Sequence, residues 1–172
     1  MKRTSNRNAA IEYLKREHIY YEYDKDKDSL YFLKFITKDE KVSVFFNIDL
    51  TDDGYIVTAL PNTGELLEGG TINFDFPLTP AQINIMGELT RFFLYINSSV
   101  KFKAIDFDPS EGSIIYQIEI GCCSSPAEAR KKLSHAVDTG MAIFCGFCEE
   151  ITDILYNGRD ASYIFPELKS HN

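Results

Sequence analysis

The chain is short of basic charge, of long apolar runs and of the glycine-rich loops that hold nucleotides. Its 172 residues include 18 lysines and arginines against 26 aspartates and glutamates, for a net charge of −8. This balance opposes binding to nucleic acid, because the phosphate backbone requires a basic face. No apolar run approaches the roughly 18 residues that cross a bilayer, so we expect no membrane association. With 10 glycines and 6 prolines, collagen-like and low-complexity classes are also excluded.

A targeting segment and a catalytic signature are missing as well. The N-terminus is basic, but no apolar stretch of signal-peptide length follows it. We therefore expect a cytoplasmic protein whose four cysteines are reduced. The sequence contains no Gly-x-Ser-x-Gly elbow, no Gly-x-Gly-x-x-Gly loop and no phosphate loop. Its three histidines, His18, His135 and His171, lie in charged or terminal surroundings. We expect neither an enzyme nor a cofactor.

What the sequence does have is enough apolar material for one core. Hydrophobic residues make up 44% of the chain, and a chain of this size buries about 70% of its surface on folding. No linker interrupts the sequence, so we predict a single domain over residues 1–172. Its C-terminal tail, 158–172, is weakly specified.

The N-terminal half of the chain predicts a helix followed by an antiparallel meander. Residues Asn8–Glu17 form the helix, and short polar connections join strands rich in aromatic and β-branched residues. The predicted strands are Ile19–Tyr23, Leu30–Ile36, Val42–Ile48 and Tyr55–Leu60. The alternating segment Thr71–Phe76 predicts a short edge strand.

The C-terminal half opens each of its helices with a capping box. The sequences Thr79-Pro80-Ala81-Gln82 and Ser125-Pro126-Ala127-Glu128 both combine a hydroxyl cap, a proline and a side chain that reaches back. The first helix runs to about Ile96, with Asn97 suited to a left-handed ending. The second runs to about Tyr156 and could break at Thr139-Gly140, and Asn157-Gly158 ends it. Between them lies a hairpin of Lys101–Asp108 and Ile114–Ile120.

The helix that begins at Pro80 has a broad apolar surface. At 100° per residue its apolar side chains cover an arc of about 200°, roughly twice what an ordinary surface helix needs. Its own sheet can cover only part of this arc. We therefore predict a homodimer with this helix or the neighbouring sheet edge at the interface. If the last helix supplies the second cover instead, the protein is a monomer.

The pair Cys145 and Cys148 has the spacing of a redox dithiol. Such a pair needs a thiolate at a helix N-terminus, whereas these cysteines also fit the apolar stripe of a helix that begins earlier. We favour core cysteines and keep a thiol redox protein as the alternative function. A zinc site with Cys122, Cys123 or His135 lacks two well-spaced ligand pairs, so no metal is predicted.

Two acidic groups are better explained without a ligand. Asp24, Asp26 and Asp28 imitate the start of a calcium loop, but Ser29 stands where that loop needs glycine. A solvated hairpin turn explains them. Glu149, Glu150 and Asp153 fit the solvated side of the last helix.

The element order resembles that of the type III secretion chaperone-like fold and, within it, the YbjN family of small bacterial proteins. Three stretches carry the resemblance: Leu89–Asn97, Lys101–Asp108 and Ser113–Ile120. It covers about Asn8 to Asn157 and rests on element order and apolar pattern. The resemblance implies no known reaction, so no catalytic residue is carried over.

Together these observations predict an α+β fold of order α-β-β-β-β-α-β-β-α, an antiparallel sheet flanked by helices. The predicted function is non-enzymatic: a protein-binding, chaperone-like or regulatory protein with a protein partner. An unpaired strand edge could receive an extended partner. The predicted partner-binding residues are Ile72, Phe74, Phe76, Ile85 and Phe92.

Overall fold

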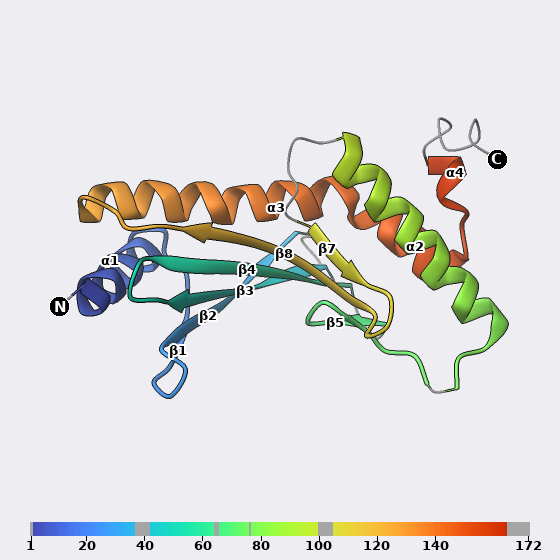
Figure 1. Cartoon of the computed structure of the whole chain (residues 1–172), viewed down its shortest axis with the longest axis horizontal. Coiled ribbons are helices and arrows are strands. Elements are labelled where there is room, and N and C mark those ends of the chain that lie inside the picture. Colours follow the sequence, from blue (N-terminus) through green and yellow to red (C-terminus); the bar gives the residue numbers. More distant parts are fainter. Residues whose placement is uncertain (1, 37–41, 64–65, 76, 100–104, 165–172) are drawn as a thin grey trace.

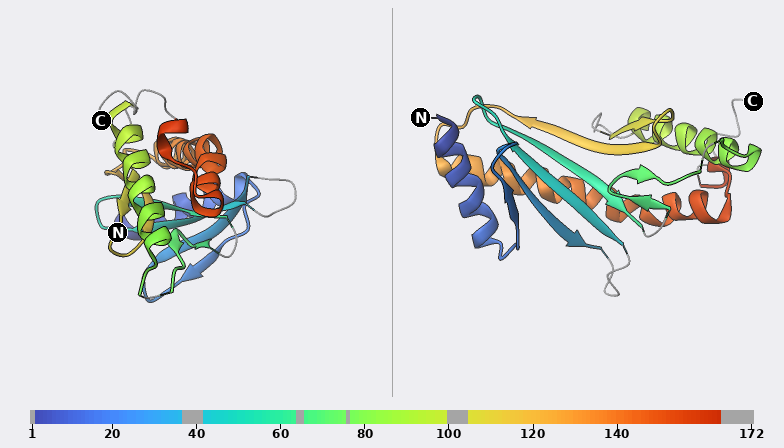
Figure 2. Two further views of the ribbon diagram at one scale, coloured as in Figure 1. Left: turned by 90° about the vertical axis from the view of Figure 1, so that its right-hand side faces the viewer. Right: turned by 90° about the horizontal axis from the view of Figure 1, so that it is seen from below.

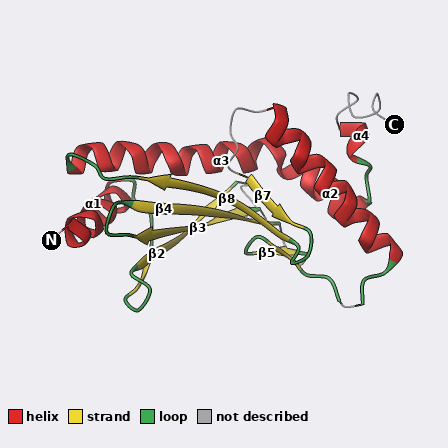
Figure 3. Ribbon diagram, viewed as in Figure 1, coloured by secondary structure: helices red, strands yellow, loops and turns green. Residues whose placement is uncertain are grey.

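The structure, a computed structural model, describes residues 2–36, 42–63, 66–75, 77–99 and 105–164. A curled antiparallel sheet lies against one long helix, with shorter helices at its two ends (Figures 1 and 3), which confirms the predicted α+β class. The helices are α1 (Lys2–Arg16), α2 (Pro80–Ser99), α3 (Pro126–Asn157) and α4 (Ala161–Ile164). The strands are β1 (Glu22–Asp24), β2 (Ser29–Phe35), β3 (Ser43–Leu50), β4 (Tyr55–Asn62), β5 (Leu67–Glu68), β6 (Thr71–Ile72), β7 (Ile105–Asp108) and β8 (Ser113–Ile120).

The sheet combines a local meander with one long-range pairing. Its strands follow the order β1-β2-β3-β4-β8-β6-β5, and β7 pairs with β8 beside this path. Strands β1 to β4 form the predicted meander. Strand β8 then returns after α2 to pair with β4, so that Tyr55 lies opposite Ile120. Every ladder between described strands is antiparallel.

Alternation along the strands gives the sheet a covered face and an open face. In β3 and β4 every second side chain is buried and those between are half-exposed, because a strand points successive side chains to opposite faces. The buried set faces α3. Seen from below, the strands lie in front of α3, and no described helix covers this open face (Figure 2, right).

Helix α3 runs unbroken along the covered face, so Gly140 is not a break. A Cβ atom at Gly140 would lie 3.1 Å from the Phe46 ring and 3.2 Å from the Ala59 Cβ. The glycine therefore lets the helix approach the sheet more closely than a side chain would allow. The predicted end of α3 is confirmed: Gly158 caps it with a left-handed φ of +61°.

The capping box of α2 forms in full, and that of α3 forms in part. The Gln82 N–H donates to the Thr79 hydroxyl at 3.3 Å, and the Thr79 N–H donates to the Gln82 side chain at 2.8 Å. At α3 the Glu128 N–H donates to the Ser125 hydroxyl at 3.2 Å. The Glu128 carboxylate reaches one residue further back than expected, to the Ser124 N–H at 2.7 Å. Hydrogen bonds from the Ser124 hydroxyl, from Lys132 and from the Ser124 N–H lower the pKa of Glu128 to about 2.

The connection from α1 to β1 departs from the prediction. His18 adopts a left-handed φ of +54°, and the Ile19 N–H donates to the Leu14 carbonyl at 2.9 Å. This is the Schellman ending of a helix, which usually uses glycine at the left-handed position. It turns the chain away from the sheet, so the strand predicted from Ile19 begins at Glu22 instead.

Helix α2 buries most of its apolar arc against α3, α4 and β7. The Phe92 ring meets Phe147 of α3 edge-on, with 5.8 Å between ring centroids. Helix α3 thus supplies the second cover that the sequence allowed. Two members of the arc stay outside: Ile83 is 58% exposed and Leu94 is 66% exposed.

The end of α2 and the C-terminal segment also differ from the predictions. The helix continues through Asn97 to Ser99, and the Asn97 side chain donates to the Ile105 carbonyl at 2.7 Å rather than forming a left-handed cap. Residues 158–164 are specified more strongly than expected, because the buried Ala161 N–H donates to the Glu88 carboxylate at 2.8 Å. Residues 165–172 of the predicted tail lie outside the described residues. Across the described ranges, none of the helices combines the length and apolarity that crossing a membrane requires.

Candidate functional site

The candidate site begins at the edge of β2 that β1 leaves unpaired. Strand β1 pairs only with the first three residues of β2. On the inner side the Ile36 N–H donates to the Val42 carbonyl at 2.8 Å. Because hydrogen-bonded pairs alternate in an antiparallel ladder, the backbone groups of Leu33 and Phe35 point to the outer edge. No strand within the described ranges pairs with them.

An apolar pocket of about 500 Å³ opens beside this edge. Its walls are the chain between α1 and β1 and the open face of β2 and β3. Leu33 and Phe35 are each 49% exposed, and Tyr20 is 85% exposed. The Tyr31 ring stacks on Phe45 with 5.7 Å between centroids and 27° between planes. We call this site the edge pocket. It consists of the outer edge of β2 at Leu33 and Phe35 together with the side chains of Tyr20, Tyr31 and Phe45.

Within the described strands, the charged residues of the open face are all acidic. The pairing registers place seven carboxylates on the same face as Leu33 and Phe35: Glu22, Asp24, Asp49, Glu68, Asp106, Asp108 and Glu119. Lys34 is the one basic residue in the described strands, and it lies on the opposite face of β2. The open face therefore attracts cations and repels anions.

An ion pair between the half-buried Arg7 and the buried Asp28 fixes the β1–β2 hairpin to α1. Asp28 is 8% exposed, and the Arg7 guanidinium approaches its carboxylate at 2.9 Å and 3.1 Å. The Tyr23 hydroxyl donates to the same carboxylate at 2.6 Å, and Arg7 lies 5.1 Å from the centre of the Tyr23 ring. The hydrogen bond to Asp28 raises the pKa of Arg7 above its ordinary value. This cluster sets the position of β1, and so the width of the edge pocket.

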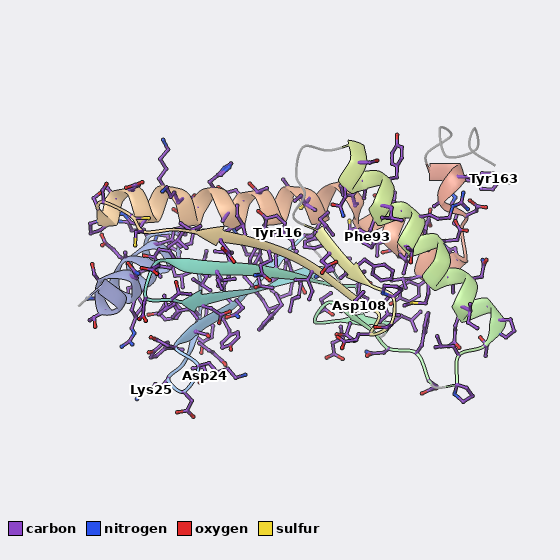
Figure 4. The ribbon with its side chains drawn as sticks, in the orientation of Figure 1. Asp24, Lys25, Phe93, Asp108, Tyr116 and Tyr163 are labelled. Atoms are coloured by element: carbon purple, nitrogen blue, oxygen red, sulfur yellow. The ribbon has the colours of Figure 1, made fainter. Side chains whose placement is uncertain are left out.

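The same cluster corrects the prediction of a solvated acidic turn. Asp24 and Lys25 do lie at the outward tip of the hairpin (Figure 4), and the Asp24 carboxylate accepts from the Asp26 N–H at 2.9 Å. Asp28 is buried and paired instead. Its left-handed φ of +55° is a conformation that aspartate tolerates better than most residues.

The structure does not bring the predicted partner-binding residues together. Phe92 is fully buried and Ile72 is 6% exposed, so neither can meet a partner in this conformation. Phe74 and Ile85 are half-buried against the core, and Phe76 lies outside the described residues. The prediction of an edge strand here is wrong, because β6 pairs with β5 on one side and with β8 on the other.

The two cysteines of the redox alternative lie far along α3, well away from its N-terminus. Cys145 is exposed, which contradicts the prediction of a core residue, and Cys148 is half-buried. Burial raises the pKa of the Cys148 thiol, whereas a redox dithiol needs a lowered one. In the loop before α3, Cys122 is exposed, and burial raises the pKa of the half-buried Cys123.

Among the described residues, the remaining titratable groups form no recognisable catalytic set. His18 ends α1 and lines the edge pocket, His135 is exposed on α3, and His171 lies outside the described residues. In the part of the chain that the structure describes, no three histidine, cysteine or acidic side chains gather as metal ligands would. The polar residues that stand out form structural contacts, such as the Tyr156 hydroxyl that donates to the Thr63 carbonyl at 2.9 Å.

Sequence reasoning missed the edge pocket, although one signal for it was present. Strand β2 is apolar on both faces near its end: Phe32 faces the core, while Leu33 and Phe35 face outward. A half-buried strand of an antiparallel sheet normally has one polar face. This second apolar face pointed to a covering partner or to a binding surface.

Comparisons of the chain with protein-family models, with curated proteins and with solved structures return no match. The resemblance to the YbjN family stays a prediction.

Proposed function

We propose that the protein is a non-enzymatic protein-binding protein that holds an extended segment of a partner against the outer edge of β2. One observation carries the proposal: the unpaired backbone groups of Leu33 and Phe35 lie beside an apolar pocket. Strand addition uses both features. The edge supplies main-chain hydrogen bonds, and a pocket receives the alternate side chains of the added strand.

The path of the chain leaves room for such a segment. Because α1 ends in a sharp turn at His18, residues 19–21 leave the sheet and the edge beyond Tyr31 stays vacant. A partner strand would occupy this vacancy and continue the line of β1. An exposed strand edge promotes aggregation, and proteins usually cover it or protect it with charged residues or proline. An edge that stays exposed is therefore expected to have a binding function. The chaperone-like resemblance in element order points to the same class of function.

The proposed compartment is the cytoplasm. All four cysteines are free thiols, and two of them, Cys122 and Cys145, are exposed. Exposed free thiols suit a reducing environment.

A selection with displayed random peptides tests the binding proposal. Wild-type protein is the bait, and the library is first depleted on the Leu33→Pro variant. Proline at this position removes only an N–H that points away from β3, so the sheet should persist. We expect synthetic copies of the selected peptides to bind the wild type and to lose at least tenfold in affinity on Leu33→Pro.

Backbone methylation of these peptides separates strand addition from simple apolar contact. Only every second N–H of an added strand pairs with the edge. A peptide with N-methyl groups on those amides should therefore not bind, whereas a peptide methylated on the amides between them should bind nearly as well as the parent. Lys34→Thr, on the opposite face of β2, serves as the control and should bind like wild type. Equal binding to wild type and Leu33→Pro, with both methylation patterns harmless, would overturn the proposal.

Helix α3 covers one side of α2, but Ile83 and Leu94 of its apolar arc stay exposed, and we also propose a homodimer through this exposed side. Ile83, Gly87 and Leu94 are exposed on this helix, at spacings that share one face. In an antiparallel pair of α2 helices, Ile83 meets Leu94 of the partner subunit, and Gly87 leaves room for close approach. Glu88 and Arg91, the charged residues of α2, pair with each other at 3.1 Å. Two copies of a chain of charge −8 can therefore meet here without repulsion between charges on the helix.

Sedimentation of charge variants tests this arrangement. Ile83→Lys and Leu94→Glu should each weaken the dimer, and the double variant should recover it, because the new charges then face opposite charges across the two-fold axis. A parallel packing would make the double variant the worst of the three. A wild-type mass of 19.6 kDa at high micromolar concentration would contradict the dimer itself.

A further inference from the structure

We infer that the segment bound at the edge pocket carries an arginine, whose guanidinium lies against the aromatic side chains of the pocket and pairs with Glu22. The inference rests on the proposed function and names the chemistry of the partner: an extended, basic segment. Three observations support it, namely the position of Glu22, the aromatic walls and the sign of the surrounding charge.

Glu22 supplies the carboxylate. It is the first residue of β1, it lies opposite Tyr31 in the register, and it lines the edge pocket. Its side chain is exposed, and no described group forms an ion pair or hydrogen bond with it. Its carboxylate is therefore available at the point where a partner strand would continue β1.

The aromatic walls supply the second half of an arginine site. Tyr31 stacks on Phe45, and the largely exposed Tyr20 stands on the other side of the pocket. A cation over an aromatic face is attracted by the ring electrons, and arginine is the residue most often found there. Its planar guanidinium can stack on a ring while its N–H groups pair with a carboxylate. A lysine ammonium has no flat face to do both.

The charge of the open face selects the same partner at longer range. Its described charged residues are carboxylates. Asp49 lies on β3, whose open face forms part of the pocket wall, and Asp106 and Glu119 lie on strands beyond the pocket. These carboxylates favour the approach of a basic segment and oppose an acidic one, more strongly at low ionic strength.

The test uses the peptides selected on the wild type. We expect the selected pool to be richer in arginine than the starting library and poorer in aspartate and glutamate. In a synthetic peptide, citrulline keeps the shape of arginine and removes its charge. Arginine→citrulline at the critical position should weaken binding about 3- to 30-fold, the span that cation–π contacts reach between exposed and desolvated sites. The affinity of the arginine→lysine peptide should lie between those of the arginine and citrulline peptides.

A double-mutant cycle assigns the effect to Glu22. Glu22→Gln should weaken the arginine peptide by a similar factor and should leave the citrulline peptide unchanged. Glu149→Gln, an equal change of charge at an exposed position on α3, should alter neither peptide by more than twofold. Free arginine amide should not bind measurably, because it lacks the strand.

The outcomes separate the two proposals. If citrulline peptides bind as tightly as arginine peptides, or if Glu149→Gln costs as much as Glu22→Gln, the arginine site is overturned. Strand addition then still stands wherever Leu33→Pro abolishes binding. If Leu33→Pro and the methylated backbones bind like their parents, the proposed function falls and takes the arginine site with it.

Discussion

The two faces of the sheet place similar residues in opposite surroundings. On the covered face, Phe32 stacks on Phe46 with 5.0 Å between centroids, under a helix that comes close at Gly140. On the open face, Leu33 and Phe35 keep about half of their surface exposed. The open face of the central strands is polar at Asn47, Thr58 and Gln117 but apolar at Phe45, Ile56 and Leu60. Leu33 and Phe35 differ from these apolar residues because they lie on the outer edge of β2, and this position marks the site.

The largest expected effect tests the covered face. Gly140→Leu should cost about 3 kcal/mol of unfolding free energy, because the side chain would be forced into Phe46 and Ala59. Gly146→Leu is the matched control on the same helix, where an added Cβ meets nothing within 4 Å. It should instead stabilise the protein by about 0.5–1 kcal/mol, because leucine favours helix over glycine. Urea unfolding followed by circular dichroism measures both, and equal effects would refute the close approach.

The two edges of β2 can be compared in the same way, because one pairs with β3 and the other is open beyond Tyr31. Lys34→Pro should cost about 3 kcal/mol, because it removes a ladder hydrogen bond to β3 opposite Val44. Leu33→Pro should cost about 1 kcal/mol or less, because its N–H points to the open edge. Thermal melts of the two variants rank them directly. The reverse order would mean that Leu33 already has a backbone partner.

A smaller effect is expected where the open edge is anchored to α1. Asp28→Asn keeps a residue that tolerates the left-handed φ and removes the charge that pairs with Arg7. The loss of this charge should lower the free energy of unfolding by about 1–2 kcal/mol, the range for hydrogen bonds to a charged partner. Asp26→Asn, an exposed position in the same turn, should be neutral. Chemical denaturation of both decides the point, and equal stability would mean that the cluster does not fix the hairpin.

The smallest effect lies at the start of α3, beside neither face. The pKa of Glu128 is lowered from 4.5 to about 2 by hydrogen bonds from Ser124 and Lys132. A lowered pKa in the folded state adds stability that is complete above pH 4.5 and falls as the pH drops to about 2. Glu128→Gln should therefore be less stable than wild type near neutral pH. The gap should close between pH 4.5 and 2 in melts across that range, whereas a constant gap would assign the effect to packing.

The sequence predicts the local elements well. Strands β2, β3 and β4 begin and end close to their predicted limits, because alternation along a strand is a local property. The caps at Thr79, Ser125 and Gly158 were also correct, since each depends on a few neighbouring residues. The prediction at Gly140 was less useful, because the sequence alone does not distinguish a helix break from a close contact.

The site itself depends on long-range structure that the sequence does not show. Thr71–Phe76 resembles an edge strand until β8 is known to lie beside β6. Likewise, Leu33 and Phe35 read as core residues until it is clear that α3 covers only one face. The vacancy beside them follows from the left-handed His18, a position where glycine is the usual residue. For these reasons Ile72 and Phe74 were assigned to an edge strand, whereas β6 pairs on both sides in the structure.

The pairing of β4 with β8 has a consequence for synthesis on the ribosome. Tyr55 leaves the ribosome long before Ile120, its partner in the ladder. At about 5–20 residues per second, several seconds separate the two. During that interval the β1–β4 meander is complete in sequence, yet both of its outer strands have exposed edges. Release of the nascent chain at this stage should yield an aggregation-prone fragment, and a chaperone that binds it would act on the β4 edge as well as on β2.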